Sequence, residues 1–493
     1  MQSNVMKRTA SASLALAGAQ LFARFIDFFL ILLLARLLTP EDFALIAIAM
    51  IFVQVTEAIL EVPVFQALIR TPRVTRNMLY TAFTISLIRS FVVVAIILIL
   101  TPVAAFLFDE PRLYALMPVL ALAPGFRGLI NPKIVLFARR LNYYPEALIS
   151  CGAKVLTALI ALPFALATQS YWALAMMTVI SPILLVFGSY LFVPFLPKLS
   201  LKSWSTFSNM IGWATVSQFF GAASWQAEVF ILAQFASRTT TGNYSVASNL
   251  NGTVSQIFIG PVFKPFISSF SELRRLGTLR EGYLLGTRTV FILTGPVFTV
   301  LAVLSAPIVM LLFGKEWGEA PLFLTILAFC KLFKTAVQPA GSVAYAFDKT
   351  IYVALITGCV FLFKTSLMYV GYVTHGIPGF LIGQILGAVV YFMISAWVVQ
   401  RLIDLSVWQQ IKTILVPALG LIAMALVMLG LKQFIDYNNQ LTLFFSIAAV
   451  AAIGSICYVT LVLIVWMLNG RPDGFEKQLI LYITRMTQRI TSK

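Results

Sequence analysis

Ten ionisable side chains stand inside long apolar segments, where a charge is costly and marks a functional site by default. The cations are Arg24, Arg127, Lys154, Lys331, Lys334 and Lys364, and the acids are Asp27, Glu57, Glu61 and Glu228. Arg and Lys bind phosphate groups well, so this net cationic set predicts a binding site for an anionic headgroup such as a pyrophosphate.

Two other interpretations of these charges remain open. Arg24 with Asp27, and Glu57 or Glu61 with a lysine, are candidates for structural ion pairs between helices. The acids are also candidates for binding a coupling H⁺ or Na⁺, because burial favours a protonated carboxyl group. No other cofactor is expected. No catalytic residue or metal site is predicted, since His375 is the only histidine and the four cysteines are not clustered.

The composition indicates what must position these charges. Of 493 residues, 60% are hydrophobic and 11% are charged, whereas a soluble domain is about 25% charged. The apolar runs recur at the length of about 20 residues that crosses a bilayer. The net charge of +17 then fits the positive-inside bias of a membrane protein better than nucleic-acid binding. The sequence therefore predicts an all-α polytopic membrane protein with about fourteen transmembrane helices.

Apolar runs between polar, Pro and Gly residues give the expected spans. They cover residues 12–37, 43–66, 78–107, 114–136, 146–168, 171–193, 209–236, 243–268, 288–313, 320–341, 350–373, 376–400, 411–432 and 440–467. Loops rich in Lys and Arg alternate with loops poor in them, which places both termini in the cytoplasm. The segment 271–283 predicts a short amphipathic helix on the membrane surface.

An internal repeat divides the chain. An ungapped alignment pairs Asp27 with Glu228, and a slightly larger offset pairs Arg127 with Lys334. We therefore expect two pseudo-two-fold-related six-helix lobes, with these pairs facing each other across a central cavity. The expected parts are an N-lobe (1–195, helices 1–6), a C-lobe (208–401, helices 7–12), two appended helices (410–468) and a cytoplasmic tail (469–493).

Three stretches carry a family resemblance. They are LARLLTPEDF at 34–43, GP to FSEL at 260–273, and LFGKEW at 312–317. Over essentially its full length the chain resembles the bacterial polysaccharide-transporter (Wzx-type) flippases, and it is most similar to their colanic-acid-exporter-like branch. This branch belongs to a superfamily that also contains the multidrug (MATE) exporters and the lipid II flippase MurJ.

The resemblance implies two six-helix lobes around a V-shaped cavity that opens by alternating access. It implies a non-enzymatic flippase that carries an undecaprenyl-pyrophosphate-linked oligosaccharide, such as an exopolysaccharide, capsule or O-antigen repeat unit, across the bacterial inner membrane. Arg24 matches the functional cavity arginines of MurJ-like members by being a basic residue on the first helix. Membrane lipids are expected partners, a polysaccharide polymerase or co-polymerase is a further candidate, and nucleic acid is not expected.

Three other function classes stay as alternatives. A MATE-like ion-coupled exporter of small amphipathic molecules should have a net acidic cavity, and this set of charges is net basic. A membrane-embedded enzyme usually carries clustered catalytic residues in a sizeable external loop, and every external loop expected here is short. A membrane scaffold would not need a charged interior.

Overall fold

The computed structural model describes residues 2–62, 64–71, 73–139, 142, 144–208 and 213–468. Helices make up most of this described part, and it contains no β-strand, so the prediction of an all-α protein is confirmed. Pro63 and the expected tail at 469–493 lie outside the described residues.

The chain forms two compact units, Met1–Val246 (unit 1) and Ala247–Lys493 (unit 2). The helices of unit 1 are α1 (Gln2–Leu37), α2 (Pro40–Ile59), α3 (Val64–Arg70), α4 (Arg76–Leu107), α5 (Leu113–Arg127), η1 (Pro132–Ile134), α6 (Val135–Arg139), α7 (Tyr144–Thr168), α8 (Trp172–Phe192), α9 (Trp204–Ser208) and α10 (Trp213–Phe235). α11 (Arg238–Arg275) begins in unit 1 and crosses the boundary. The lobe limits expected from the sequence stay a prediction.

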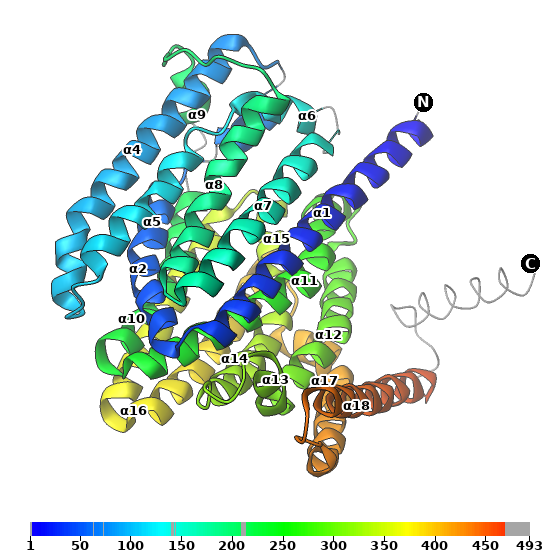
Figure 1. Ribbon diagram of the computed structural model, residues 1–493. Helices are drawn as coiled ribbons and strands as arrows, with labels where there is room; N and C mark the ends of the chain where they lie inside the picture. Colours follow the sequence, from blue (N-terminus) through cyan, green and yellow to red (C-terminus); the bar gives the residue numbers. More distant parts are fainter. Residues whose placement is uncertain are drawn as a thin grey trace, which may run out of the picture. The chain divides into compact units, whose positions relative to one another are not determined.

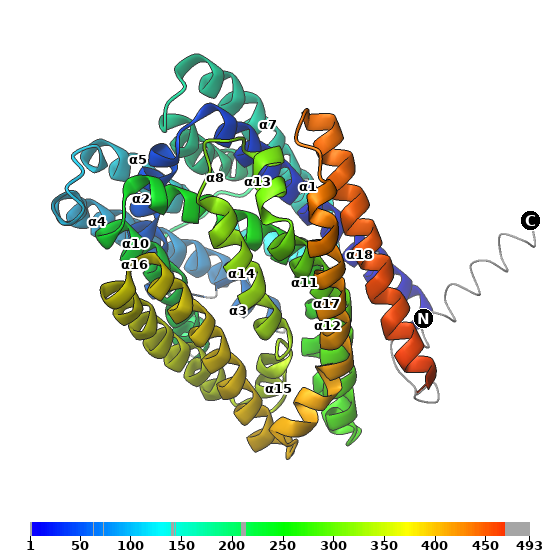
Figure 2. The ribbon, with the colours of Figure 1, turned by 90° about the horizontal axis from the view of Figure 1, so that it is seen from below.

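Unit 2 contains the remaining elements. They are α12 (Leu279–Val303), α13 (Ser305–Leu312), α14 (Ala320–Thr335), α15 (Ala340–Ala346), α16 (Thr350–Ile403), α17 (Val407–Leu431), η2 (Lys432–Phe434) and α18 (Gln440–Leu468). α17 lies between α12 and α18 and packs on both (Figure 2). The core of this part includes Leu421, Met424 and Tyr458.

Ten helices in the described part are long and apolar enough to cross a membrane. One of them, α16, has 54 residues and supplies two of the expected spans, because its backbone leaves helical geometry at Gly376 (φ 63°, ψ −141°). A Cβ on Gly371 would lie 2.2 Å from the carbonyl oxygen of Gly379, so the two limbs pack against each other as a hairpin. The total of fourteen spans stays a prediction, since α5 has only 15 residues and α11 is rich in polar side chains.

In unit 1 (Figure 1), α1 packs on α7, α7 on α8, α8 on α5 and α5 on α4, and α2 packs on α10. α2 begins with a capping box, in which Thr39 accepts a hydrogen bond from the Asp42 amide and Asp42 accepts one from the Thr39 amide. Gly242, near the start of α11, lies so close to α2 that a Cβ there would collide with the Pro40 carbonyl oxygen. The starts of α2 and α11 therefore touch through their backbones.

The order of elements repeats along the chain, as the alignment predicts. α5 ends at Arg127 and α14 ends at Thr335, and each is followed by a break and then by a short helix that begins near Pro132 or Pro339. The helix is therefore interrupted inside both expected spans, 114–136 and 320–341, although Ala320–Ala346 as a whole is long and apolar enough to cross a membrane. Asn131 explains the first break, because its side chain accepts from the Lys133 amide and donates to the Val193 carbonyl.

Three other expected elements differ from the structure. The span 43–66 ends early, because α2 stops at Ile59 and α3 begins at Val64. The span 288–313 is broken at Leu304, between α12 and α13. The amphipathic helix expected at 271–283 is instead the end of α11, a turn with Gly277 at φ 77°, and the start of α12. Glycine is the residue that adopts this left-handed conformation at no steric cost.

Candidate functional site

α2 presents three polar side chains on one side. The spacing of three and four residues places these side chains on one helix face: Gln54, Glu57 and Glu61. The first two lie within α2, and Glu61 follows two residues after the helix ends at Ile59. Gln226 of α10 donates from Nε2 to Gln54 Oε1 at 2.6 Å. The stripe therefore faces other helices of unit 1, as expected for charged groups that must avoid lipid.

Glu57 forms an ion pair with Arg127. Nη1 of Arg127 lies 2.6 Å from each carboxylate oxygen of Glu57, and the two side chains are 43% and 16% exposed, Arg127 being the more exposed. Arg127 is the last residue of α5, where the helix dipole favours a cation. Within the described part of the chain only Nη1 is engaged, so the three N–H groups on Nε and Nη2 remain available to an anion.

Asp27 pairs with Lys154 rather than with Arg24. Lys154 Nζ lies 2.7 Å from Asp27 Oδ1, because α7 packs along α1 and brings the lysine to it. Arg24, one turn before Asp27, is exposed and contacts no charged or hydrogen-bonding group among the described residues. The interpretation of Arg24 and Asp27 as an ion pair is therefore wrong.

Arg89 of α4 is a further cation in an expected span, and the sequence prediction did not include it. Its Nη2 lies 2.9 Å from Glu61 Oε2, so Glu61 is also one half of an ion pair. The same guanidinium donates to the carbonyl oxygens of Leu60 (2.8 Å) and Glu57 (3.1 Å). The last carbonyls of a helix have no partner within it, so Arg89 caps α2. Its position inside the span 78–107 is the signal that would have identified it.

Glu228, the repeat equivalent of Asp27, has a different partner. The hydroxyl of Tyr244 donates to its carboxylate, and both side chains are buried where α10 meets α11. The repeat therefore places an acid at both positions, but Asp27 pairs with a lysine and Glu228 accepts a hydrogen bond from a tyrosine.

The three remaining predicted cations belong to unit 2. Lys331 and Lys334 are half-buried on α14, and Lys334 lies in its last turn, as Arg127 does in α5. Lys364 is 3% exposed on the first limb of α16, where its methylene groups lie against Gly387 of the second limb. In unit 1 the four predicted acids are matched by four cations once Arg89 is included, so the excess of positive charge belongs to unit 2. Apposition of the two sets across a cavity stays a prediction.

A separate cluster lies at the turn between α4 and α5. Glu110 accepts hydrogen bonds from Nε and Nη2 of Arg112, both at 2.8 Å, and Arg112 lies over the ring of Tyr171. Arg238, at the start of α11, donates to the Phe108 carbonyl and lies 3.9 Å from Glu110. The hydrogen bond from Arg112 lowers the pKa of Glu110. The cluster therefore connects the turn between α4 and α5 with Tyr171, directly before α8, and with the start of α11.

Known proteins resemble this chain in both sequence and fold. Residues 33–321, more than half of the chain, match the family described as polysaccharide biosynthesis protein. The chain belongs to this family. The succinoglycan biosynthesis transport protein ExoT of Rhizobium meliloti (strain 1021) is 22% identical over 369 residues, which cover 69% of this chain and 74% of that protein. The resemblance to polysaccharide transporters is thereby confirmed.

Two solved structures have a fold similar to that of this chain. The lipid II flippase MurJ in an inward closed conformation matches with a TM-score of 0.70 and 14% identity, over 92% of this chain and 98% of that one. An inward-facing multidrug resistance MATE family transporter matches with a TM-score of 0.59 and 15% identity, over 79% and 96%. The chain is thus a multi-span integral membrane protein with a MurJ- and MATE-like fold. Family and fold point to a transporter rather than to an enzyme.

Proposed function

We propose that the protein is a flippase that moves an undecaprenyl-pyrophosphate-linked oligosaccharide from the cytoplasmic to the periplasmic leaflet of the bacterial inner membrane. The family supplies the context of polysaccharide biosynthesis, and the fold is one that allows alternating access. The observation that carries the proposal is the state of Arg127. It is a half-exposed guanidinium inside a membrane protein, held on one nitrogen by Glu57, and no residue in the described part of the chain is bonded to its other two nitrogens.

A pyrophosphate is the chemistry that such a site fits. Arginine recognises phosphate oxygens through parallel N–H donors, and Nε and Nη2 of Arg127 form one such edge. We further propose that other predicted cations bind anionic groups of the substrate: Arg24 and Lys154 in unit 1, and Lys331, Lys334 and Lys364 in unit 2. No bond is made or broken in this function, so the protein needs binding groups and a conformational change but no catalytic residue.

A transfer assay tests the proposal. The purified protein is placed in liposomes that carry a labelled undecaprenyl-pyrophosphate oligosaccharide, and transfer between leaflets is measured. The wild type should transfer the lipid, and Arg127→Ala combined with Lys334→Ala should not. Arg275→Ala is the control, because this arginine is 76% exposed and forms only a surface pair with Glu272.

The outcomes separate the candidate functions. If the double variant transfers the lipid at the wild-type rate, the cationic site is wrong and the flippase proposal stands. If the wild type transfers none of several repeat units but drives efflux of a cationic dye with an ion gradient, the protein is an exporter of small amphipathic molecules.

The coupling ion and the orientation belong to the same proposal. We infer that Asp27, Glu57, Glu61 or Glu228 binds a coupling H⁺ or Na⁺, and that both termini are cytoplasmic. Transfer should then respond to a pH or Na⁺ gradient, and a tag at either terminus should be protected from protease in right-side-out vesicles. A rate that responds to neither gradient would refute coupling, and an accessible tag would refute the orientation. A polymerase or co-polymerase partner would be recovered by cross-linking in native membranes.

A further inference from the structure

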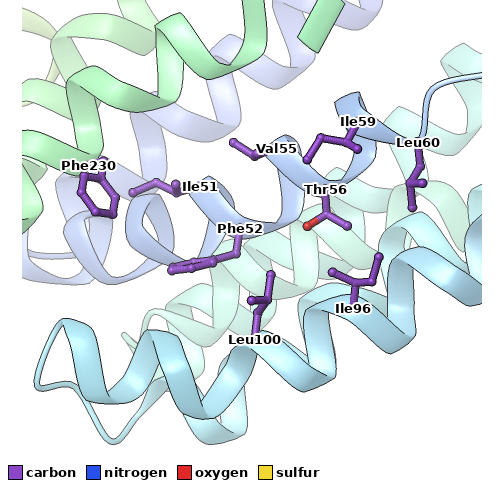
Figure 3. A pocket seen from close by; sticks show the side chains of 9 residues that line it. All are labelled: Ile51, Phe52, Val55, Thr56, Ile59, Leu60, Ile96, Leu100 and Phe230. Carbon is purple, nitrogen blue, oxygen red and sulfur yellow. The ribbon is translucent and has the colours of Figure 1, made fainter. Parts of the chain in front are cut away.

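An apolar slot lies between α2 and α4 in unit 1 (Figure 3). Its volume is about 240 Å³, and Thr56 is the only polar residue among those that line it. The lining residues are Ile51, Phe52, Val55, Thr56, Ile59 and Leu60 of α2, Ile96 and Leu100 of α4, and Phe230 of α10. At 100° per residue this face of α2 lies opposite Gln54 and Glu57, so the helix separates the slot from the ion pair of Glu57 with Arg127.

The two ends of the slot differ in chemistry. At one end Phe108 packs edge-on against two lining rings, with centroids 6.1 Å from Phe52 and 5.6 Å from Phe230. At the other end Leu60 leads to Arg89, which is bound to the Leu60 carbonyl and to Glu61. Within the described residues, Nη1 of Arg89 makes no hydrogen bond. The slot is thus closed by aromatic rings at one end and bordered by a guanidinium at the other.

The depth of Arg89 follows from what covers α4. Exposed apolar side chains run along this helix from Ile88 to Phe106, a length of about 27 Å at 1.5 Å per residue and close to the ~30 Å of a hydrocarbon core. Beyond Ile88, the irregular segment before α9 covers the helix, and its Ser200 amide donates to Thr84. Irregular backbone does not face hydrocarbon. Arg89 therefore lies at the headgroup level, on the side of the basic residues Arg73 and Arg76 that is expected to be cytoplasmic.

We propose that this slot holds the hydrocarbon chain of the lipid-linked substrate in the cytoplasmic leaflet, with the phosphate end near Arg89. The inference rests on the proposed function and adds a second site to it. A volume of about 240 Å³ takes about eight groups of water size at ~30 Å³ each, which is room for a stretch of hydrocarbon chain.

The chemistry of the slot selects the same ligand. Since only Thr56 is polar, an oligosaccharide or a lipid headgroup would lose its hydrogen bonds there, whereas a hydrocarbon chain loses nothing. The slot lies in the half of α2 that approaches the basic side, and its aromatic end points away from that side. A chain can therefore enter from the cytoplasmic leaflet with its headgroup toward Arg89. Glu61 occupies the neighbouring nitrogen of Arg89, so this guanidinium orients the headgroup and the apolar slot supplies most of the affinity.

Photolabelling tests the proposal in the full-length protein in liposomes. The probe is a polyprenyl pyrophosphate with a diazirine about eight carbon atoms from the pyrophosphate, within the stretch of chain that the slot can hold, and the labelled residues are located by mass spectrometry. Labels should fall on residues 51–60, at the end of α2, and on residues 92–100 of α4. Excess unlabelled polyprenyl pyrophosphate should remove them, and an equal amount of phosphatidylglycerol should not. This map is made on the wild type and needs no variant to fold.

Two matched variants locate the site. Ile96→Trp fills the slot and should lower the labelling about tenfold, the change that corresponds to 1.4 kcal/mol of binding. Ile99→Trp is the control, since Ile99 is on the same helix and is 70% exposed. Labelling of other helices alone, equal labelling in both tryptophan variants, or removal of the label by phosphatidylglycerol would overturn the proposal. Leaflet transfer is measured in the same liposomes. Transfer without labelling in the slot rejects only this site, whereas no transfer by the wild type rejects the proposed function.

Discussion

Replacing Glu57 with glutamine should strengthen binding of the anionic substrate. Both oxygens of this carboxylate lie 2.6 Å from Nη1 of Arg127, so a phosphate that approaches the arginine must compete with a charge already there. Glutamine keeps the shape of the side chain and removes the charge. Arg127 then has its full positive charge available to the phosphate.

The size of the effect follows from the exposure of the pair. At 2.6 Å two unit charges attract by about 6 kcal/mol at an effective dielectric constant of 20, but Arg127 is 43% exposed and this value is strongly screened. Polar contacts between membrane helices measure about 0.6 kcal/mol on average and about 1.7 at most. At 1.4 kcal/mol per factor of ten, Glu57→Gln should lower the Kd about 3- to 16-fold.

The assay is equilibrium binding of a labelled undecaprenyl-pyrophosphate oligosaccharide to the purified protein in detergent. Asp109→Asn is the control, because it also removes one negative charge, on an exposed turn where asparagine tolerates the left-handed conformation (φ 47°). Weaker binding in Glu57→Gln would refute the reasoning, since it would mean that Glu57 positions Arg127 instead of competing for it. An equal gain in affinity in Asp109→Asn would show that the effect comes from the overall charge of the protein and not from the pair of Glu57 with Arg127.

Two further predictions concern stability. Gly242→Ala should destabilise the protein by about 1–3 kcal/mol, because its Cβ meets the Pro40 carbonyl oxygen and the helices must separate. The control is Gly252→Ala on the same helix, where the added Cβ meets open space. In a thermal-shift assay the control should match or exceed the wild-type Tm, and Gly242→Ala should lower it. Arg112 holds the pKa of Glu110 below its ordinary value of 4.5, so their pair stabilises the fold fully above that pH and loses this contribution as the pH falls through the lowered pKa. The Tm gap between the wild type and Glu110→Gln should therefore shrink below pH 4.5, and a gap that stays constant with pH would contradict the pairing.

The sequence predicts the helices well because their signals are local. Apolar runs mark the helical segments, and the repeat aligns the breaks at Pro132 and Pro339, where a proline cannot donate to the preceding turn. Gly376 separates the two limbs of α16 at the first residue of the expected span 376–400, directly after the gap that follows span 350–373. Errors arise where side chains from elsewhere act on the backbone, as Asn131 does when it binds the carbonyl of Val193.

The ion pairs are less predictable from sequence. Spacing shows that Gln54, Glu57 and Glu61 share a face, but which helix opposes that face depends on packing between distant segments. Arg127 reaches Glu57 across seventy positions of sequence, and Lys154 reaches Asp27 across 127. A single sequence carries no signal for those partners. It does carry the signal for Arg89, a charge inside an apolar run, and consistent use of that rule would have included it.

The repeat duplicates positions without duplicating their chemistry. At the offset that pairs Asp27 with Glu228, the equivalent of Glu57 is Phe258. Unit 1 therefore supplies an acid beside its helix-terminal cation Arg127, and the second repeat has Phe258 at the position that matches this acid. The repeat thus conserves the cation at the end of the helix without conserving the carboxylate of Glu57. Under the proposed function both cations contribute to binding the pyrophosphate, so Arg127→Ala and Lys334→Ala measured separately should each weaken substrate binding. Wild-type affinity in either variant would remove that cation from the proposed anion-binding groups.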